Sequence, residues 1–232
     1  MVRRATPGTN EPVKPPPAPA AAGAANDASI TGVIGATGSG KSLWVKAQLR
    51  AQKPTRLIVW DHKHEYPMAP PPTLAALLQQ LRGERFAVSW RPSGVDATRW
   101  KEFDLVCRAV AAAGRCTFVV EELAFVTSPM RAPAGWRALS LTGRHDGLRL
   151  IGTSQRPASI DKDFLGNCTT IHCGRVNSLP DVETMARMLA VPRDQVAGLE
   201  NLQWLERDMT TGRVTTGRIR PPNGNPGLQG RP

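Results

Sequence analysis

The stretch at residues 35–42, Gly-Ala-Thr-Gly-Ser-Gly-Lys-Ser, constrains the fold of this chain more than any other feature. It fits the pattern GxxxxGK[ST], with an apolar segment before it and a helix-period segment after it. The glycines let the backbone curl so that several N–H groups point at phosphates, and the helix N-terminus adds partial positive charge. The pattern predicts a phosphate-binding loop made of Gly35, Ala36, Thr37, Gly38, Ser39, Gly40, Lys41 and Ser42.

Two side chains of this loop have predicted tasks. The ammonium group of Lys41 would bridge the β- and γ-phosphates of a nucleoside triphosphate, and the hydroxyl of Ser42 would ligate magnesium. The predicted ligands are therefore ATP and Mg²⁺.

Apolar segments alternate with helix-period segments through the middle of the chain. We expect strands at 30–34, 56–60, 86–90, 117–120, 148–153 and 169–173. We expect helices at 41–51, 73–81, 97–113, 135–142 and 181–189, the last capped by Ser178. This alternation predicts an α/β fold, a P-loop NTPase of the RecA/ASCE-like type with a mainly parallel central sheet flanked by helices.

The two ends of the chain differ in composition from its middle. Residues 1–28 are rich in Pro and Ala, and residues 220–232 are rich in Pro and Gly. Such segments bury too little apolar surface to offset the entropy of ordering, so we expect disordered tails around an ATPase domain at 29–219. No apolar run approaches the roughly 18 residues of a membrane span, and the N-terminus lacks an apolar signal core. We therefore expect a cytoplasmic protein.

Two consecutive glutamates end the apolar segment Phe118-Val119-Val120. We expect them at the tip of a strand beside the phosphate loop. Glu121 would be the magnesium-side carboxylate, and Glu122 would be the general base that polarises the attacking water. Most such sites have Asp at the first position, so Glu121 is a departure. A second acid favours water as the nucleophile, and hence hydrolysis.

An amide follows the next predicted strand. Gln155 comes shortly after the apolar segment 148–153, and we expect this strand to lie next to the acidic one. A glutamine there can donate to the γ-phosphate and accept from the attacking water.

Together these residues resemble the FtsK/HerA superfamily of DNA-pumping ATPases. The resemblance lies in Arg-His-Asp-Gly at 144–147 and Thr-Ser-Gln-Arg-Pro at 153–157. The run 59–65 also resembles the family's second strand, which often ends in Asp with a Glu four residues on, and the resemblance covers roughly residues 30–213. It implies a homo-oligomeric, usually hexameric, ring that threads nucleic acid through a central pore. It also implies that Arg144 is the arginine finger that reaches a neighbour's nucleotide, with Arg156 as the alternative.

Because the chain is short for this superfamily, the resemblance is greatest to its small single-domain members. The chain resembles the genome-packaging ATPases of tailless, internal-membrane icosahedral phages, and less closely the filamentous-phage assembly ATPases similar to zonula occludens toxin. The packaging resemblance implies backbone contacts to double-stranded DNA, a capsid or membrane docking partner, and action in the host cytoplasm or association with the virion. The net charge of +11 also favours a polyanionic partner.

Two other classes of function fit the phosphate loop. A small-molecule nucleotide or metabolite kinase would need an acceptor pocket and a lid with paired arginines, and it leaves Glu121, Glu122 and Gln155 unexplained. A non-hydrolysing nucleotide-binding assembly protein would have a defective site, whereas each expected group is present here.

Overall fold

The computed structural model describes residues 28–220 apart from 93 and 95, and it describes only the backbone at 144 and 145. Of the two predicted tails, residues 1–27 and 221–232 lie outside the described residues.

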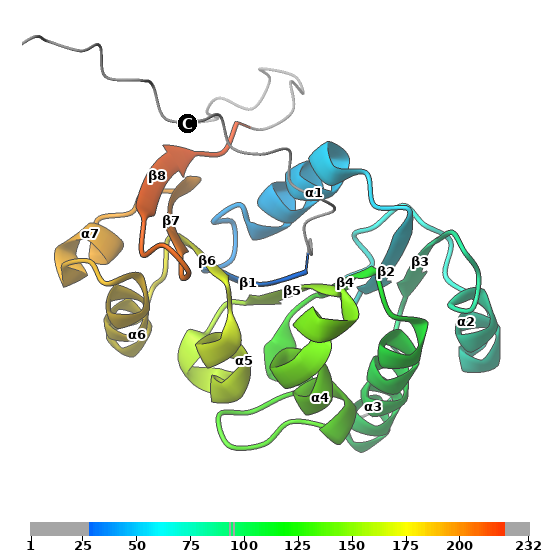
Figure 1. The fold of residues 1–232 in the computed structure, drawn as a ribbon. Coiled ribbons are helices and arrows are strands. Elements are labelled where there is room, and N and C mark those ends of the chain that lie inside the picture. Colours follow the sequence, from blue (N-terminus) through cyan, green and yellow to red (C-terminus); the bar gives the residue numbers. More distant parts are fainter. Residues whose placement is uncertain (1–27, 93, 95, 221–232) are drawn as a thin grey trace, which may run out of the picture.

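An eight-stranded sheet forms the centre of the molecule, in the order β3-β2-β4-β5-β1-β6-β7-β8 (Figure 1). Strands β1 to β6 run parallel, whereas β7 and β8 continue the sheet as an antiparallel hairpin. The strands are β1 (Ser29–Ile34), β2 (Arg56–Trp60), β3 (Phe86–Trp90), β4 (Thr117–Val120), β5 (Arg149–Ser154), β6 (Thr170–Gly174), β7 (Gln203–Asp208) and β8 (Val214–Arg218).

Helices cover both faces of this sheet. Helix α1 lies on one face, and α3, α4 and α5 lie on the other (Figure 1). Helix α2 lies near the β3 edge, and α6 and α7 lie near β6 and β7. The helices are α1 (Lys41–Gln52), α2 (Leu74–Gln80), α3 (Asp96–Ala113), α4 (Ala134–Thr142), α5 (Lys162–Asn167), α6 (Leu179–Leu189) and α7 (Arg193–Ala197), with short 3-10 turns η1 (Leu123–Phe125), η2 (Gly143–Asp146) and η3 (Pro157–Ser159).

Alternate residues of the strands feed two apolar cores. Val33 and Val59 belong to the core that includes Val45 of α1, whereas Trp60 and Phe118 belong to the larger core on the opposite face. Because the β-strand period is two, neighbouring residues of a buried parallel strand must both be apolar. The near-continuous apolar segments of the sequence have this cause.

The structure confirms the predicted α/β class and each predicted strand and helix, with ends shifted by a few residues at most. One expected neighbour is wrong. The acidic strand β4 is not paired with β1, because β5 lies between them and hydrogen-bonds to both. The strand that precedes Gln155 is therefore the one beside the phosphate loop. Helices α5 and α7 and the β7–β8 hairpin were not predicted.

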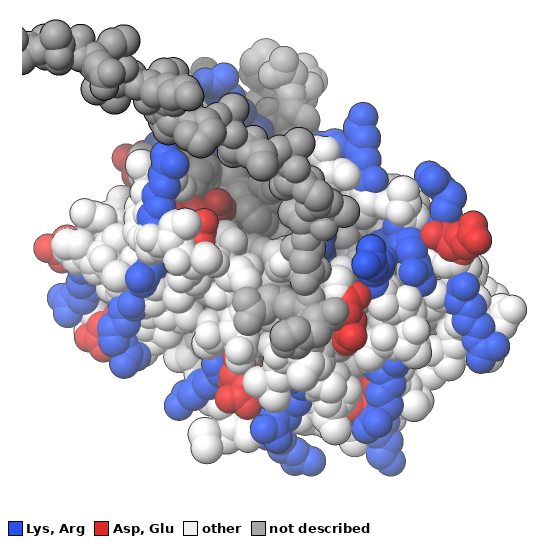
Figure 2. Space-filling model, in the orientation of Figure 1, with Lys and Arg blue, Asp and Glu red and all other residues white. Residues whose placement is uncertain are grey.

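Charged side chains are spread over the visible face of the molecule. Lys and Arg occur around its periphery with Asp and Glu between them, rather than gathering in one patch (Figure 2). Among residues 28–220, with the gaps noted above, no helix combines the length and apolar composition that crossing a bilayer requires.

Candidate active site

The phosphate loop connects β1 to α1 and adopts a backbone that glycine makes possible. Gly38 and Gly40 have φ of 77° and 98°, in the left-handed region where a side chain is strained. A Cβ at Gly40 would also lie 2.5 Å from Cδ1 of Ile219, so the residue after β8 packs against the loop. The loop is therefore contacted by Ile219, which is distant in the sequence, as well as by its own helix α1.

Lys41 lies inside the loop. Its side chain is buried, and Nζ donates to the carbonyls of Gly35 at 2.5 Å and Ala36 at 3.2 Å. Burial lowers the pKa of Lys41, while the charges of Glu122 and Glu121 raise it. Both predicted carboxylates therefore act on the same ammonium group.

Glu121 follows β4 and is almost completely buried, at 1% exposed. Its Oε1 accepts a hydrogen bond of 3.0 Å from the hydroxyl of Tyr66. Burial raises the pKa of Glu121, and the Tyr66 hydrogen bond opposes this rise. Tyr66 is fixed in turn by Asp61, whose carboxylate accepts the backbone N–H groups of Glu65 at 2.9 Å and Tyr66 at 3.2 Å. Asp61 thus caps the turn after β2, and Tyr66 is a site residue that sequence reasoning missed.

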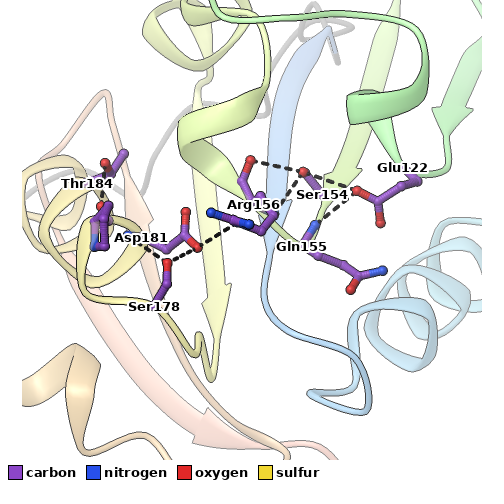
Figure 3. A network of polar contacts seen from close by, with 8 residues as sticks. Glu122, Ser154, Gln155, Arg156, Ser178, Asp181 and Thr184 are labelled. Carbon is purple, nitrogen blue, oxygen red and sulfur yellow. Dashed lines mark hydrogen bonds and ion pairs between the residues drawn. The ribbon is translucent and has the colours of Figure 1, made fainter.

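Glu122 has an unusual backbone and a partly held carboxylate. Its φ is 56°, and its N–H donates to Oγ1 of Thr153 at 3.0 Å. Its Oε1 accepts from the Ser154 hydroxyl at 3.3 Å and from the Gln155 N–H at 3.2 Å (Figure 3). Its Oε2 is buried and has no hydrogen-bond partner among the described residues. One oxygen is therefore fixed by β5, and the other is left to interact with a water or substrate.

Gln155 reaches the phosphate loop from β5. The hydroxyl of Thr37 donates to Oε1 of Gln155 at 2.8 Å. Arg175, the residue after β6, approaches Thr37 as well: its NH2 group lies 3.4 Å from the Thr37 carbonyl oxygen. Arg175 belongs to no motif, so the sequence offered no signal for it.

Arg156 extends a polar network away from the site. Its N–H donates to Oγ of Ser154 at 3.1 Å, and its Nε lies 3.3 Å from Oδ2 of Asp181 (Figure 3). Asp181, near the start of α6, also accepts from the hydroxyl of Ser178, which is the N-cap expected from the sequence. The Arg156 side chain is 61% exposed.

Arg144 belongs to η2, between α4 and β5, and its side chain lies outside the described part of the structure. Because η2 precedes β5, Arg144 lies at the edge of the sheet where β5 begins. The phosphate loop lies at the opposite edge, where β1 and β5 end.

The structure thus places most of the predicted site residues at one edge of the sheet. Lys41, Glu121, Glu122 and Gln155 meet there through the contacts above, and Ser42 lies in the first turn of α1 beside Lys41. In the described residues no group of three or more His, Cys, Asp or Glu side chains is arranged to hold a metal. Magnesium bound by hydroxyl, phosphate and water oxygens with one carboxylate needs no such group.

Comparisons with solved structures agree with this fold. The genome packaging NTPase B204 from Sulfolobus turreted icosahedral virus 2, in complex with AMPPCP, superimposes with a TM-score of 0.66 at 18% identity, over 83% of this chain and 98% of B204. VirB4 of Thermoanaerobacter pseudethanolicus gives a TM-score of 0.54 at 13% identity, over 83% of this chain and 89% of VirB4. At these identities the likeness shows the fold alone, and it confirms the predicted P-loop NTPase architecture.

A sequence relative lies closer than these structures. No protein-family model matches the chain. However, the chain is 30% identical over 174 residues to protein P9 of Pseudoalteromonas phage PM2, and the match covers 73% of this chain and 79% of P9. A phage protein is thus among its relatives, as the resemblance to phage ATPases implied. The chain belongs to the family of the phage PM2 protein P9.

Proposed function

We propose that this chain is an ATP-hydrolysing subunit of a DNA translocase that packages a viral genome. The observation that carries the proposal is the arrangement of Glu122, with one carboxylate oxygen held by β5 and the other unpartnered, beside a complete phosphate loop. Its membership of the phage P9 family and its likeness in fold to a viral genome packaging NTPase support the packaging role.

The loop residues fit ATP and Mg²⁺. The left-handed glycines expose backbone N–H groups to the phosphates, and Lys41 would exchange its two loop carbonyls for phosphate oxygens. Ser42 and Glu121 would hold Mg²⁺, Glu121 through water. When bound, the ion neutralises charge that develops on the phosphates.

The carboxylate of Glu122 would act as the general base. Its free Oε2 accepts a proton from the attacking water while Oε1 stays on Ser154 and Gln155. The Gln155 side chain would leave Thr37 to orient the water and contact the γ-phosphate. A small-molecule kinase would need an acceptor pocket and a lid with paired arginines, and it gives the contact between Gln155 and the phosphate loop no role.

The ring and its partners follow from the same proposal. Arg144 lies at the far edge of the sheet from the loop of its own chain, so as an arginine finger it would serve a nucleotide on a neighbouring subunit of a homo-oligomer, a hexameric ring. Arg156, the alternative finger, is paired with Asp181 of its own chain. Double-stranded DNA would be contacted through its backbone. We further propose a capsid or membrane docking partner, action in the host cytoplasm and association with the virion.

The first experiment measures the ATPase rate with and without double-stranded DNA for the wild-type chain, Glu122→Gln and the control Glu183→Gln. Glu183 is a half-exposed glutamate on α6 that pairs with Arg193. We expect DNA to stimulate the wild type and the control, and Glu122→Gln to lose about 10²- to 10⁴-fold, the usual contribution of a general base. Full activity in Glu122→Gln would exclude Glu122 as the base, and a wild-type rate that DNA does not change would argue against the translocase.

A further inference from the structure

The backbone of Arg175 is hydrogen-bonded to the phosphate loop. Gly174, the last residue of β6, packs so closely on the loop that a Cβ there would lie 3.1 Å from Cβ of Ser39. The carbonyl of Arg175 then accepts the N–H of Ala36 at 2.7 Å. The base of the Arg175 side chain is therefore held in a constant position relative to the loop.

The guanidinium group of Arg175 contacts neutral oxygen atoms. It donates to Oδ1 of Asn177 and, at 3.4 Å, to the carbonyl of Thr37, which are both neutral oxygens. In the part of the chain that the structure describes, no carboxylate is paired with it. A permanently charged, partly buried arginine normally has an anionic partner, and its planar fork matches phosphate oxygens.

The position of Arg175 indicates which anion it meets. Thr37 is contacted from one side by Gln155 through its hydroxyl and from the other by Arg175 through its carbonyl. Since Gln155 is the amide proposed above to contact the γ-phosphate, Arg175 would border the same phosphate from the β6 side. The carboxylates of Glu121 and Glu122 add negative charge to this edge, which a further cation would offset.

We propose that Arg175 binds the terminal phosphate of the ATP held by its own chain. This inference rests on the proposed function, because it requires ATP as the substrate. On binding, the guanidinium exchanges the Thr37 carbonyl for γ-phosphate oxygens. The site then contains an arginine from its own chain in addition to one from a neighbour.

Calorimetric binding of AMP-PNP and of ADP, each with Mg²⁺, tests the proposal. We expect Arg175→Ala to weaken AMP-PNP binding about ten- to hundredfold, the size of a lost charge-assisted hydrogen bond, and to leave ADP binding unchanged. Arg175→Lys keeps the charge and should retain part of the AMP-PNP affinity. The control Arg193→Ala removes an equal charge from an exposed arginine of α7 and should alter neither ligand.

A second variant separates phosphate binding from support of the loop. Asn177→Ala removes the neutral partner of Arg175, so it should preserve AMP-PNP binding. A loss in Asn177→Ala equal to that in Arg175→Ala would overturn the proposal, because Arg175 would then act as a structural brace. Equal losses of AMP-PNP and ADP in Arg175→Ala, or no loss, would overturn it as well. Failure of the wild type to bind either nucleotide would refute the proposed function itself, before any variant is compared.

Discussion

Replacing Ser154 by alanine tests how Glu122 is positioned. The Ser154 side chain is completely buried, and its hydroxyl proton lies within reach of Glu122 Oε1 and of the Arg156 carbonyl, each at 3.3 Å. Ser154→Ala removes this donor but leaves the Gln155 N–H, at 3.2 Å, on the same carboxylate oxygen. The base would keep one of its two restraints.

The expected loss follows from these contacts. A hydrogen bond to a charged group contributes about 1.5–3 kcal/mol, and 3.3 Å is long for an O–H···O bond, so the lower end of this range applies. A loss of about 1.4 kcal/mol in the transition state corresponds to a tenfold lower kcat. KM should not change, because among the described residues the Ser154 hydroxyl contacts no residue of the phosphate loop. The Ser154 carbonyl, which accepts the N–H of Gly35 at 3.1 Å, stays in place in the alanine variant.

Steady-state ATPase kinetics with a matched serine control decide this prediction. Ser140 of α4 is also completely buried, and its hydroxyl donates to the Arg137 carbonyl at 3.2 Å, away from the site. Ser140→Ala should keep the wild-type kcat at a similar loss of stability. If Ser154→Ala retains the wild-type kcat, or if it raises KM alone, the hydroxyl does not position the base and the reasoning is wrong.

Two further predictions concern stability. Burial lowers the pKa of His172 despite the hydrogen bond with Glu206. The unfolded chain therefore binds more protons than the folded chain, and the free energy of unfolding should fall as the pH drops below about 6.5. His172→Phe should flatten this fall, measured as the thermal unfolding temperature between pH 7 and 5.5. A Cβ at Gly152 would lie 2.6 Å from Cζ of Phe164, so Gly152→Ala should cost about 1–3 kcal/mol in urea unfolding through overpacking. Gly166→Ala meets no atom within 4 Å and serves as its control; an equal loss in the two variants would contradict the packing argument.

The parts of the fold that could be predicted are those with a local cause. The phosphate loop has a specific motif, and the parallel strands are buried on both faces, so segments such as 57–60 and 118–120 are continuously apolar. The sequence places Glu121, Glu122 and Gln155 directly after two of these strands. Because the carboxyl ends of parallel strands meet at one edge of the sheet, their common location at that edge could be predicted. Strand order has no such local signal, which explains why β5 was not expected between β1 and β4.

The missed elements have a different cause. The β7–β8 hairpin lies at the sheet edge, and both strands are largely half-exposed and polar, so neither shows an apolar run. Tyr66 and Arg175 act through contacts with residues distant in sequence: Tyr66 reaches Glu121, and Arg175 reaches Thr37. No spacing within the sequence signals such pairs. The chemical roles predicted from the sequence for Lys41, Glu121, Glu122 and Gln155 stay predictions.

The left-handed backbone of Glu122 sets the catalytic role proposed for this residue against the thermal stability of the fold. A side-chain-bearing residue at φ 56° costs roughly 1–2 kcal/mol relative to the ordinary helical conformation, and glycine or asparagine would relieve much of that cost. Laboratory evolution that selects only for heat resistance would therefore favour Glu122→Gly or Glu122→Asn and remove the general base proposed above. To keep the proposed ATPase activity, a stabilised variant has to be selected for ATP turnover and heat resistance together.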